Sequence, residues 1–161
     1  MSDDDLIMAF FPCTRFEAQI QLYMRGDAFG QGKWSEIDKV NYARRLEKER
    51  SEYYDLVSML ALIVLERNLK MVIENPYSTQ HYLTKYFPIK PKWIDHDRRQ
   101  RGDAYYKPTQ YWFIGFDPSN NFVLEPITLP EKYLKEKSEN TVTRSMITPQ
   151  YARRFIQEFI L

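Results

Sequence analysis

Asp5-Leu-Ile-Met-Ala-Phe-Phe-Pro-Cys-Thr-Arg15 carries the clearest strand signal of this chain together with its only cysteine. The apolar run from Leu6 to Phe11 does not alternate with polar residues, which predicts a strand buried on both faces, as in the parallel sheet of an α/β protein. Pro12 cannot donate a ladder hydrogen bond and ends this strand, so Cys13 follows at its carboxyl edge. Because ligands of open α/β sheets bind at that edge, we expect a functional site beside Cys13.

A second stretch, Leu69-Lys-Met-Val-Ile-Glu-Asn-Pro76, repeats the same design. It predicts another buried strand, which would bring Glu74 and Asn75 to the edge that holds Cys13. A thiol and a carboxyl placed alike on two neighbouring strands indicate a single site.

The segment between the two strands predicts a long crossover helix. Ser35 is a good N-cap with Asp38 three residues later, and no proline or glycine follows before about Arg67. The second half of this segment is apolar nearly all round, so we expect it to pack on the sheet. Right-handed crossovers join parallel strands, and the pattern therefore predicts an α/β fold with a short, mostly parallel sheet.

The carboxyl-terminal part of the chain predicts fewer elements. Gln110 to Phe116 reads as a third strand, with Phe122 to Pro126 as a short hairpin partner. The charged stretch Glu131 to Asn140 predicts an exposed loop or a helical turn. Pro149 to Leu161 predicts a terminal helix, because proline suits the first helical turn and the apolar residues recur at helical spacing.

Glycines gather between Arg25 and Lys33. Glycine lowers the steric cost of unusual backbone angles, so this stretch predicts a loop. Two interpretations stay open, a lid over the Cys13 edge and a surface connection without a role.

Composition favours one globular domain over residues 1–161. The chain is 43% apolar and 28% charged, and its net charge of +1 gives no whole-chain signal for nucleic acid or a membrane. One cysteine and two separated histidines, His81 and His96, favour neither a disulfide framework nor a structural zinc site, which fits a cytoplasmic protein without a metal. The acidic start does not resemble a signal peptide, and the apolar run Leu60 to Leu65 is too short to span a bilayer.

The stretch from Tyr77 to Lys107 is locally rich in rings and cations. Such interleaving is typical of nucleic-acid surfaces, where rings stack on bases and cations hold phosphates. The alternative is an irregular segment fixed to the core by its rings, with Asp95, Asp97 and Asp103 pairing with the arginines. The candidate nucleic-acid contacts, together with two residues outside the stretch, are Arg15, Lys92, Arg98, Arg99, Arg101, Lys107 and Gln110.

These residues allow a specific chemistry at the predicted edge. A thiolate at Cys13 attacks an electron-poor carbon if nearby positive charge, from Arg15 or from Arg98 or Arg99, lowers its pKa. Attack on C6 of cytosine also needs a proton or hydrogen-bond donor at N3. Glu74 follows an apolar run that favours its protonated form, and Asn75 is placed to hold it.

The order of the motifs resembles that of the cytosine-5 DNA methyltransferases. The resemblance rests on Phe11-Pro-Cys13, on Glu74-Asn75, on Pro108-Thr-Gln110 before a strand, and on Arg144-Ser-Met-Ile-Thr-Pro149 before the last helix. It implies that Cys13 is the nucleophile, that Glu74 is its acid partner and that Asn75 supports Glu74. It also implies a partial Rossmann-like methyltransferase fold and a target base taken out of the duplex.

The chain departs from that family in its cofactor motifs. The glycine-rich S-adenosylmethionine loop and the acidic ribose ligand are both absent, and the arginines expected after Gln110 are replaced by Tyr111, Trp112 and Phe113. Arg98, Arg99 or Arg101 are candidates to substitute for them. Methyl transfer would then need S-adenosylmethionine bound by another protein that covers the sheet edge. The alternatives are an inactive binding protein of a phage or mobile element that occupies DNA or inhibits a host nuclease, a homo-oligomer, and a structural remnant.

Overall fold

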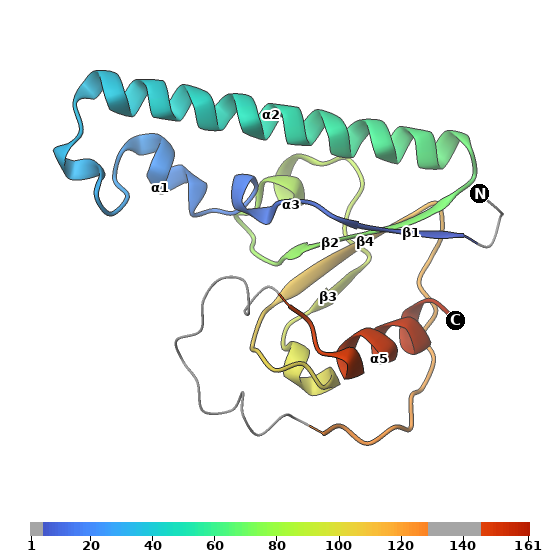
Figure 1. Cartoon of the computed structure of the whole chain (residues 1–161). Coiled ribbons are helices and arrows are strands. Elements are labelled where there is room, and N and C mark those ends of the chain that lie inside the picture. The colour runs from blue at the N-terminus through green and yellow to red at the C-terminus, as the bar shows by residue number, and fades with distance from the viewer. Residues whose placement is uncertain (1–4, 129–145) are drawn as a thin grey trace.

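The computed structural model describes residues 5–128 and 146–161 and shows a mixed α/β fold (Figure 1). The strands are β1 (Leu6–Phe10), β2 (Lys70–Pro76), β3 (Trp93–Asp95) and β4 (Thr109–Ile114). The helices are α1 (Ile20–Arg25), α2 (Glu36–Glu66), α3 (Tyr82–Tyr86) and α5 (Pro149–Phe159), with the 3-10 turns η1 (Cys13–Arg15), η2 (Gln31–Lys33) and η3 (Arg98–Arg101).

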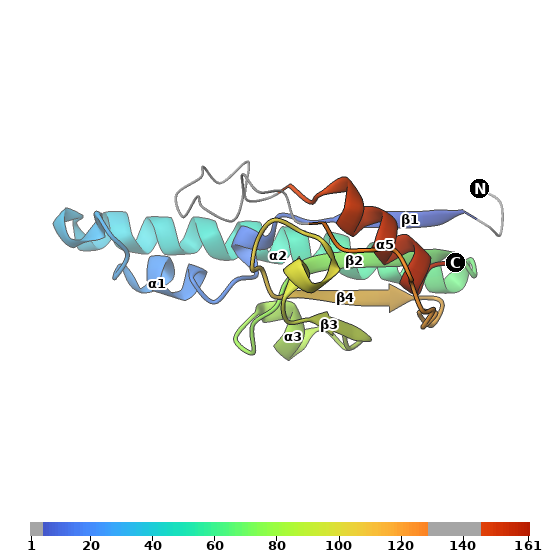
Figure 2. The same ribbon diagram turned by 90° about the horizontal axis from the view of Figure 1, so that it is seen from below.

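The four strands form one sheet in the order β1-β2-β4-β3, which can be followed across Figure 2. β1 and β2 are parallel, as their crossover predicts, and Phe10 lies opposite Glu74 in the register. β4 runs antiparallel to both β2 and β3. The expectation of a mostly parallel sheet was therefore wrong, because only one of the three strand pairs is parallel. The reversal follows from β4, which enters from the opposite end of the sheet after η3.

One face of the sheet packs against α2. Ser35 caps α2 by accepting a hydrogen bond from the Asp38 amide at 3.1 Å, as the sequence predicts. The second half of α2 packs Val57, Ala61 and Val64 on the sheet. The strand residues that complete this core are Met71 and Ile73 of β2 and Trp112 and Ile114 of β4.

The opposite face packs against α5, a helix capped by the Thr148 side chain. Its core contains Val72, Tyr111, Phe113, Tyr151, Phe155 and Phe159. α5 lies on the side of the sheet away from α2 (Figure 1) and packs on Val72 of β2 and on Tyr111 and Phe113 of β4. Met8 and Phe10 of β1 remain 39% and 63% exposed, so β1 is not buried on both faces as its apolar run predicts.

α2 is longer than the sheet that it covers. Its first half extends past the strands together with α1, which lies alongside it (Figure 1). The glycine-containing stretch 25–33 joins α1 to α2 at the far end of this arm. It is fixed by Gln31, whose side chain accepts a hydrogen bond from the Ala28 amide and donates one to the Tyr23 carbonyl. This placement fits a connection within the arm better than a lid over Cys13.

Two other expectations concern the carboxyl-terminal third. Phe122 to Pro126 forms no strand, and β4 pairs with β2 and β3 instead, so the predicted hairpin was wrong. The stretch 131–140 and Arg144 lie outside the described residues.

Candidate functional site

Cys13 lies in η1, directly after β1, in the position that the sequence predicts. A turn in which the Glu17 amide donates to the Cys13 carbonyl at 3.0 Å brings the Glu17 carboxylate to the thiol, which donates a hydrogen bond to it. Burial and this carboxylate raise the pKa of the Cys13 thiol to about 12. The expectation that neighbouring cations lower this pKa is not met, because burial and the Glu17 carboxylate together outweigh the positive charge of Lys107.

Glu74 is directed to the α5 side of β2, and its side chain is 18% exposed. Its Oε1 atom lies 3.9 Å from Nη1 of Arg98. Burial raises the pKa of Glu74 above its ordinary value, while the positive charges of Lys107 and Arg98 act in the opposite direction. A carboxyl that holds its proton more strongly than usual is suited to donate it to a bound ring.

The positive charge of Lys107 acts on both Cys13 and Glu74. Its positive charge lowers the pKa of the Cys13 thiol and of Glu74, although burial dominates both groups. The Glu74 charge in turn raises the pKa of Cys13, so the three side chains lie near enough to influence one another. Within residues 5–128 and 146–161, the side chain of Lys107 has no hydrogen-bond or ion-pair partner, and only its backbone carbonyl accepts a hydrogen bond, from Thr109. Its ammonium group is therefore available to a ligand at this edge.

Asn75 is fully buried beside Glu74. Its Nδ2 donates to the Glu74 carbonyl oxygen at 2.6 Å, and its Oδ1 has no hydrogen-bond partner among the described residues. The side chain fixes the backbone that carries Glu74, which is compatible with the supporting role predicted for it.

Arg98 is the one of the three η3 arginines that reaches Glu74. It is 1% exposed, forms an ion pair with the buried Asp103 carboxylate and lies 4.7 Å above the centre of the Tyr151 ring. The Tyr151 hydroxyl continues the network to Tyr111 at 2.7 Å and to Asp95 at 3.1 Å. Arg98 thus has a fixed position beside the Glu74 carboxyl.

The other two arginines are paired as the alternative interpretation expects. Arg99 is exposed and makes a two-point contact with Asp97, at 2.9 and 2.8 Å. Arg101 is 3.5 Å from Asp95 and also pairs with Glu158 at 3.1 Å. All three aspartates of the stretch 77–107 therefore pair with its arginines.

The remaining predicted contacts lie apart from the Cys13 and Glu74 pair or are engaged elsewhere. Arg15 is bound to Glu49 of α2 at 2.6 Å. Lys92 donates to the Phe116 carbonyl and pairs with Asp117 at 2.7 Å. Gln110 is fully buried, where it accepts from Thr84 and donates to the Pro76 carbonyl, both at 2.8 Å. A nucleic-acid role for these three stays a prediction.

A cavity of about 510 Å³ opens between β1 and α5 beside this site. Its walls are apolar, and Glu74 and Arg98 form its polar part. The residues that define this groove, called the β1–α5 groove below, include Leu6, Met8 and Phe10 of β1 and Tyr151, Phe155 and Ile156 of α5.

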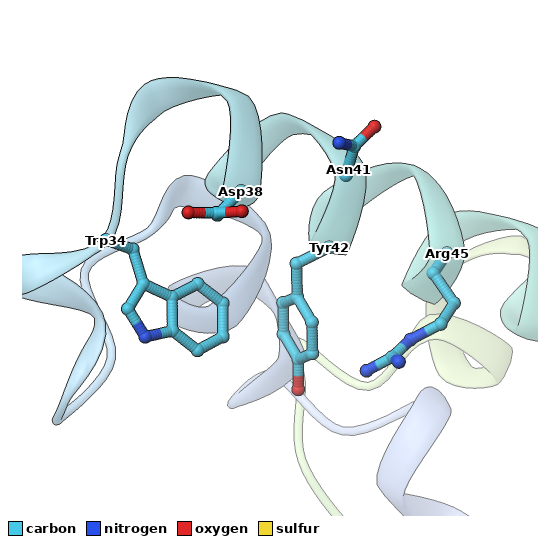
Figure 3. A pocket seen from close by; sticks show the side chains of 5 residues that line it. All are labelled: Trp34, Asp38, Asn41, Tyr42 and Arg45. Atoms are coloured by element: carbon cyan, nitrogen blue, oxygen red, sulfur yellow. The ribbon is translucent and has the colours of Figure 1, made fainter.

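A second cavity, of about 550 Å³, lies on the arm at the start of α2 (Figure 3). The Trp34 and Tyr42 rings meet edge to face at 5.1 Å, and the Arg45 guanidinium lies 4.8 Å from the Tyr42 ring centre. Asp38 also lines the cavity, so its charges are of both signs. None of the predicted site residues lines it.

The described residues contain neither a membrane-spanning helix nor a cluster of metal ligands. No helix among them is long and apolar enough to cross a bilayer. Within the same residues, no three His, Cys, Asp or Glu side chains gather in a way that could hold a metal ion.

Comparison with known proteins identifies no relative. No protein-family model, no curated protein and no solved structure matches this chain. The function therefore has to be argued from the site itself.

Two features of the site were not predicted from the sequence. Glu17 lies four residues after Cys13, a spacing at which a tight turn brings side chains together, but a single carboxylate at that spacing is too common to be singled out. Lys107 was assigned to phosphate, whereas its position beside Cys13 and Glu74 depends on the path of the chain from η3 into β4.

Proposed function

We propose that this chain activates cytosine in DNA, as the base-activating part of a cytosine-5 DNA methyltransferase. The observation that supports this proposal is the buried Glu74 carboxyl, whose raised pKa favours its protonated form, at the edge that also carries the Cys13 thiol. Arg98, whose Nη1 atom lies 3.9 Å from Oε1 of Glu74, supports the proposal as a candidate substitute for the arginines that the sequence after Gln110 lacks.

The proposed step is an addition to the cytosine ring. Sγ of Cys13 forms a bond to C6, and its proton passes to the Glu17 carboxylate that already accepts a hydrogen bond from it. The electron pair of the C5–C6 double bond moves toward N3, where the Glu74 carboxyl donates its proton. Lys107 stabilises the Glu74 carboxylate that remains. The product is a covalent adduct with a nucleophilic C5.

The described residues do not fit S-adenosylmethionine. The turn after β1 contains Pro12, Cys13 and Thr14 rather than a glycine-rich loop, and the turn after β2 continues into Tyr77 without an acidic ribose ligand. The chain would therefore supply the activated base, and a second protein would supply the methyl donor.

Hydrogen exchange at C5 tests the addition without any cofactor. Once Cys13 has added to C6, C5 takes up a solvent proton, and loss of the original hydrogen followed by release of Sγ regenerates cytosine. A DNA strand with tritium at C5 of cytosine, offered single-stranded to avoid the cost of base extrusion, should release tritium into water in the presence of this chain alone.

The variants make this experiment specific. Cys13→Ser should reduce tritium release to background, and Glu74→Gln should lower it by about 10²-fold or more, the usual contribution of a general acid. Asp117→Asn, a matched amide substitution at an exposed carboxyl, should leave it unchanged. Release that survives Cys13→Ser, or no release from the unaltered chain, would exclude the proposed reaction.

A second candidate function is that of a binding protein that has kept the fold without the reaction. The thiol pKa of about 12 favours it, because less than one thiol in 10⁴ would be ionised at neutral pH by a rough calculation. In that case, binding of DNA or of a host nuclease should be indifferent to Cys13→Ser and Glu74→Gln, and tritium release should be absent.

A further inference from the structure

The cavity at the start of α2 combines aromatic, cationic and anionic side chains. Trp34 and Tyr42 supply rings, Arg45 supplies a guanidinium, and Asp38 and Asn41 supply planar polar groups (Figure 3). It differs in this from the β1–α5 groove, whose walls are apolar. Rings stack on bases, cations hold phosphates, and carboxylates and amides bind the edges of bases. The cavity therefore offers a matching group for each part of a nucleotide.

The ring and the cation of this cavity are accessible. Tyr42 lies between Trp34 and Arg45 (Figure 3), and the Arg45 guanidinium covers the Tyr42 ring at 4.8 Å. The Trp34 ring is 39% exposed and is therefore the ring that is open to stacking. Arg45 is held only loosely, because its Nε lies 3.8 Å from Glu49, whose other oxygen binds Arg15 at 2.6 Å. Arg45 can exchange this contact for a phosphate.

The carboxylate of the cavity suits the edge of a base. Oδ2 of Asp38 accepts a hydrogen bond from Ser35 at 2.6 Å, and its Oδ1 has no hydrogen-bond partner among the described residues. A free carboxylate oxygen accepts from an amino group, which cytosine, adenine and guanine all carry. Asp38 would repel a simple anion, and Arg45 would repel an organic cation. The two charges together favour a nucleotide, which has both a donor edge and an anionic backbone.

A smaller cavity continues from Tyr42 to the turn that holds Cys13. Its volume is about 270 Å³, and its lining includes Tyr42 of α2 together with Arg15 and Glu17. Glu17 accepts the hydrogen bond of the Cys13 thiol. Because Tyr42 lines both cavities, one surface leads from the thiol side of the candidate site to Trp34 on the arm.

We propose that the arm binds a nucleotide of the single strand that carries the target cytosine, with its base on Trp34 and its phosphate at Arg45; this rests on the proposed function for the place of that cytosine. Asp38 lies eleven residues before Glu49, the residue that binds the Cys13 turn through Arg15, and this part of α2 spans about 16 Å. Stacked nucleotides at about 3.4 Å each cover that distance with about five nucleotides.

Titration with a labelled strand tests the stacking contact. The probe is a fluorescein-labelled strand of deoxyadenosines with one central cytosine, longer than the estimated span on both sides, titrated into the full chain by fluorescence anisotropy. We expect saturable binding that Trp34→Ala weakens about tenfold or more, because a base stacked on an aromatic ring contributes at least that much. Phe29→Ala is the matched control and should leave binding unchanged, since Phe29 is a fully exposed ring of the same arm that lines neither cavity.

The salt dependence of binding tests the phosphate contact. Arg45→Gln should weaken strand binding and reduce the slope of log affinity against log salt by about 0.7, the contribution of one contact to a single strand. Arg44→Gln removes the same charge from the neighbouring residue, which is exposed and lines neither cavity. This control should leave the slope unchanged.

Three results would overturn the proposal. The first is the absence of saturable binding, and the second is an equal effect of Trp34→Ala and Phe29→Ala. The third is that deoxyadenosine monophosphate binds as tightly as the strand, because the cavity would then take a free nucleotide.

Tritium release separates this proposal from the proposed function. Release that Trp34→Ala leaves unchanged at a limiting concentration of strand would overturn the arm site and leave the proposed function standing. Strand binding that depends on Trp34 without any release would overturn the proposed function and the place of the target cytosine, and would leave only the binding of a strand to the arm.

Discussion

The two edge strands of the sheet, β3 and β1, differ in how far other elements cover them. The β3 edge consists of three residues, Trp93–Asp95, of which Trp93 and Asp95 make side-chain contacts with other elements. The β1 edge is longer and apolar, and much of it faces solvent. The comparison shows that side chains from elements outside the sheet can cover an edge strand, and that no described residue covers the outer side of β1 in this way.

Aromatic and ionic contacts close the β3 edge. The Trp93 ring stacks on Tyr111 at 5.0 Å and meets Phe159 of α5 at 4.1 Å. Arg101 covers the same ring at 4.6 Å while it pairs with Asp95 and Glu158. The strand is therefore held by α5 and η3 as well as by β4.

The largest loss of stability is expected from breaking the buried ion pair between Arg98 and Asp103. Arg98→Met leaves the Asp103 carboxylate, 1% exposed, without its ion-pair partner. Removing one member of a buried pair typically costs about 3–5 kcal/mol, because an uncompensated charge remains. Urea unfolding monitored by circular dichroism measures the loss. A loss below about 1 kcal/mol would show that solvent reaches Asp103.

His81, the residue that precedes α3, gives the stability of the fold a dependence on pH. It is fully buried near Phe16 and Trp112, and burial lowers the pKa of His81 from 6.5 to about 4. In the unfolded chain His81 takes up a proton below pH 6.5, whereas in the folded chain it does so only near pH 4. Stability is therefore complete above pH 6.5 and falls by about 3 kcal/mol as the pH drops to 4.

The variant His81→Phe isolates this contribution. Neither ring nitrogen of His81 has a hydrogen-bond partner among the described residues, so an apolar ring of similar shape loses no polar contact. Urea unfolding at several pH values should show that His81→Phe removes most of the decline between pH 6.5 and 4. An unchanged decline would assign it instead to carboxylates whose pKa is lowered in the folded chain, such as Asp97, which accepts hydrogen bonds from Arg99.

Truncation of one ring at each edge tests the comparison directly. Trp93→Ala should destabilise the protein by about 2–4 kcal/mol, because it removes packing with Tyr111 and Phe159. Phe10→Ala, at a side chain 63% exposed, should cost less than about 1 kcal/mol. Thermal and urea unfolding of the two variants give the difference. Equal losses would mean that both edges are closed in solution.

The smallest effect on stability is expected from Met8→Lys. The position is 39% exposed, so the free energy of unfolding should change by no more than about 0.5–1 kcal/mol. The charge should instead reduce concentration-dependent light scattering, because charged residues on an edge strand oppose pairing with other chains. Scattering that stays the same as in the unaltered chain would locate self-association elsewhere.

Local sequence signals predicted most of the elements. The run Leu6 to Phe11 and the cap at Ser35 correspond to β1 and α2, and Thr148-Pro149 begins α5, because each signal depends on neighbours within one or two turns. The antiparallel direction of β4 was missed. The direction of β4 depends on where the chain re-enters the sheet after η3. The hydrophobic pattern of the strand contains no information on that point.

The site was predicted less completely than the fold. Cys13 and Glu74 come to one edge because two parallel strands end there, and that follows from sequence. The partners of the three η3 arginines do not follow from the sequence. η3 is a single turn in which Arg99 points outward, while Arg98 and Arg101 point inward. The raised thiol pKa arises from burial and Glu17, and both are set by tertiary packing.

The length of α2 has a consequence for local opening. The helix spans about 46 Å, of which only the second half packs on the sheet. Its backbone amides should therefore exchange with solvent at two rates, slowly near Val57 and Val64 and faster near Ile37 and Val40, whose side chains are 73% and 66% exposed. One continuous helix would then belong to two cooperative units, and the arm could unravel and reform while the sheet stays folded.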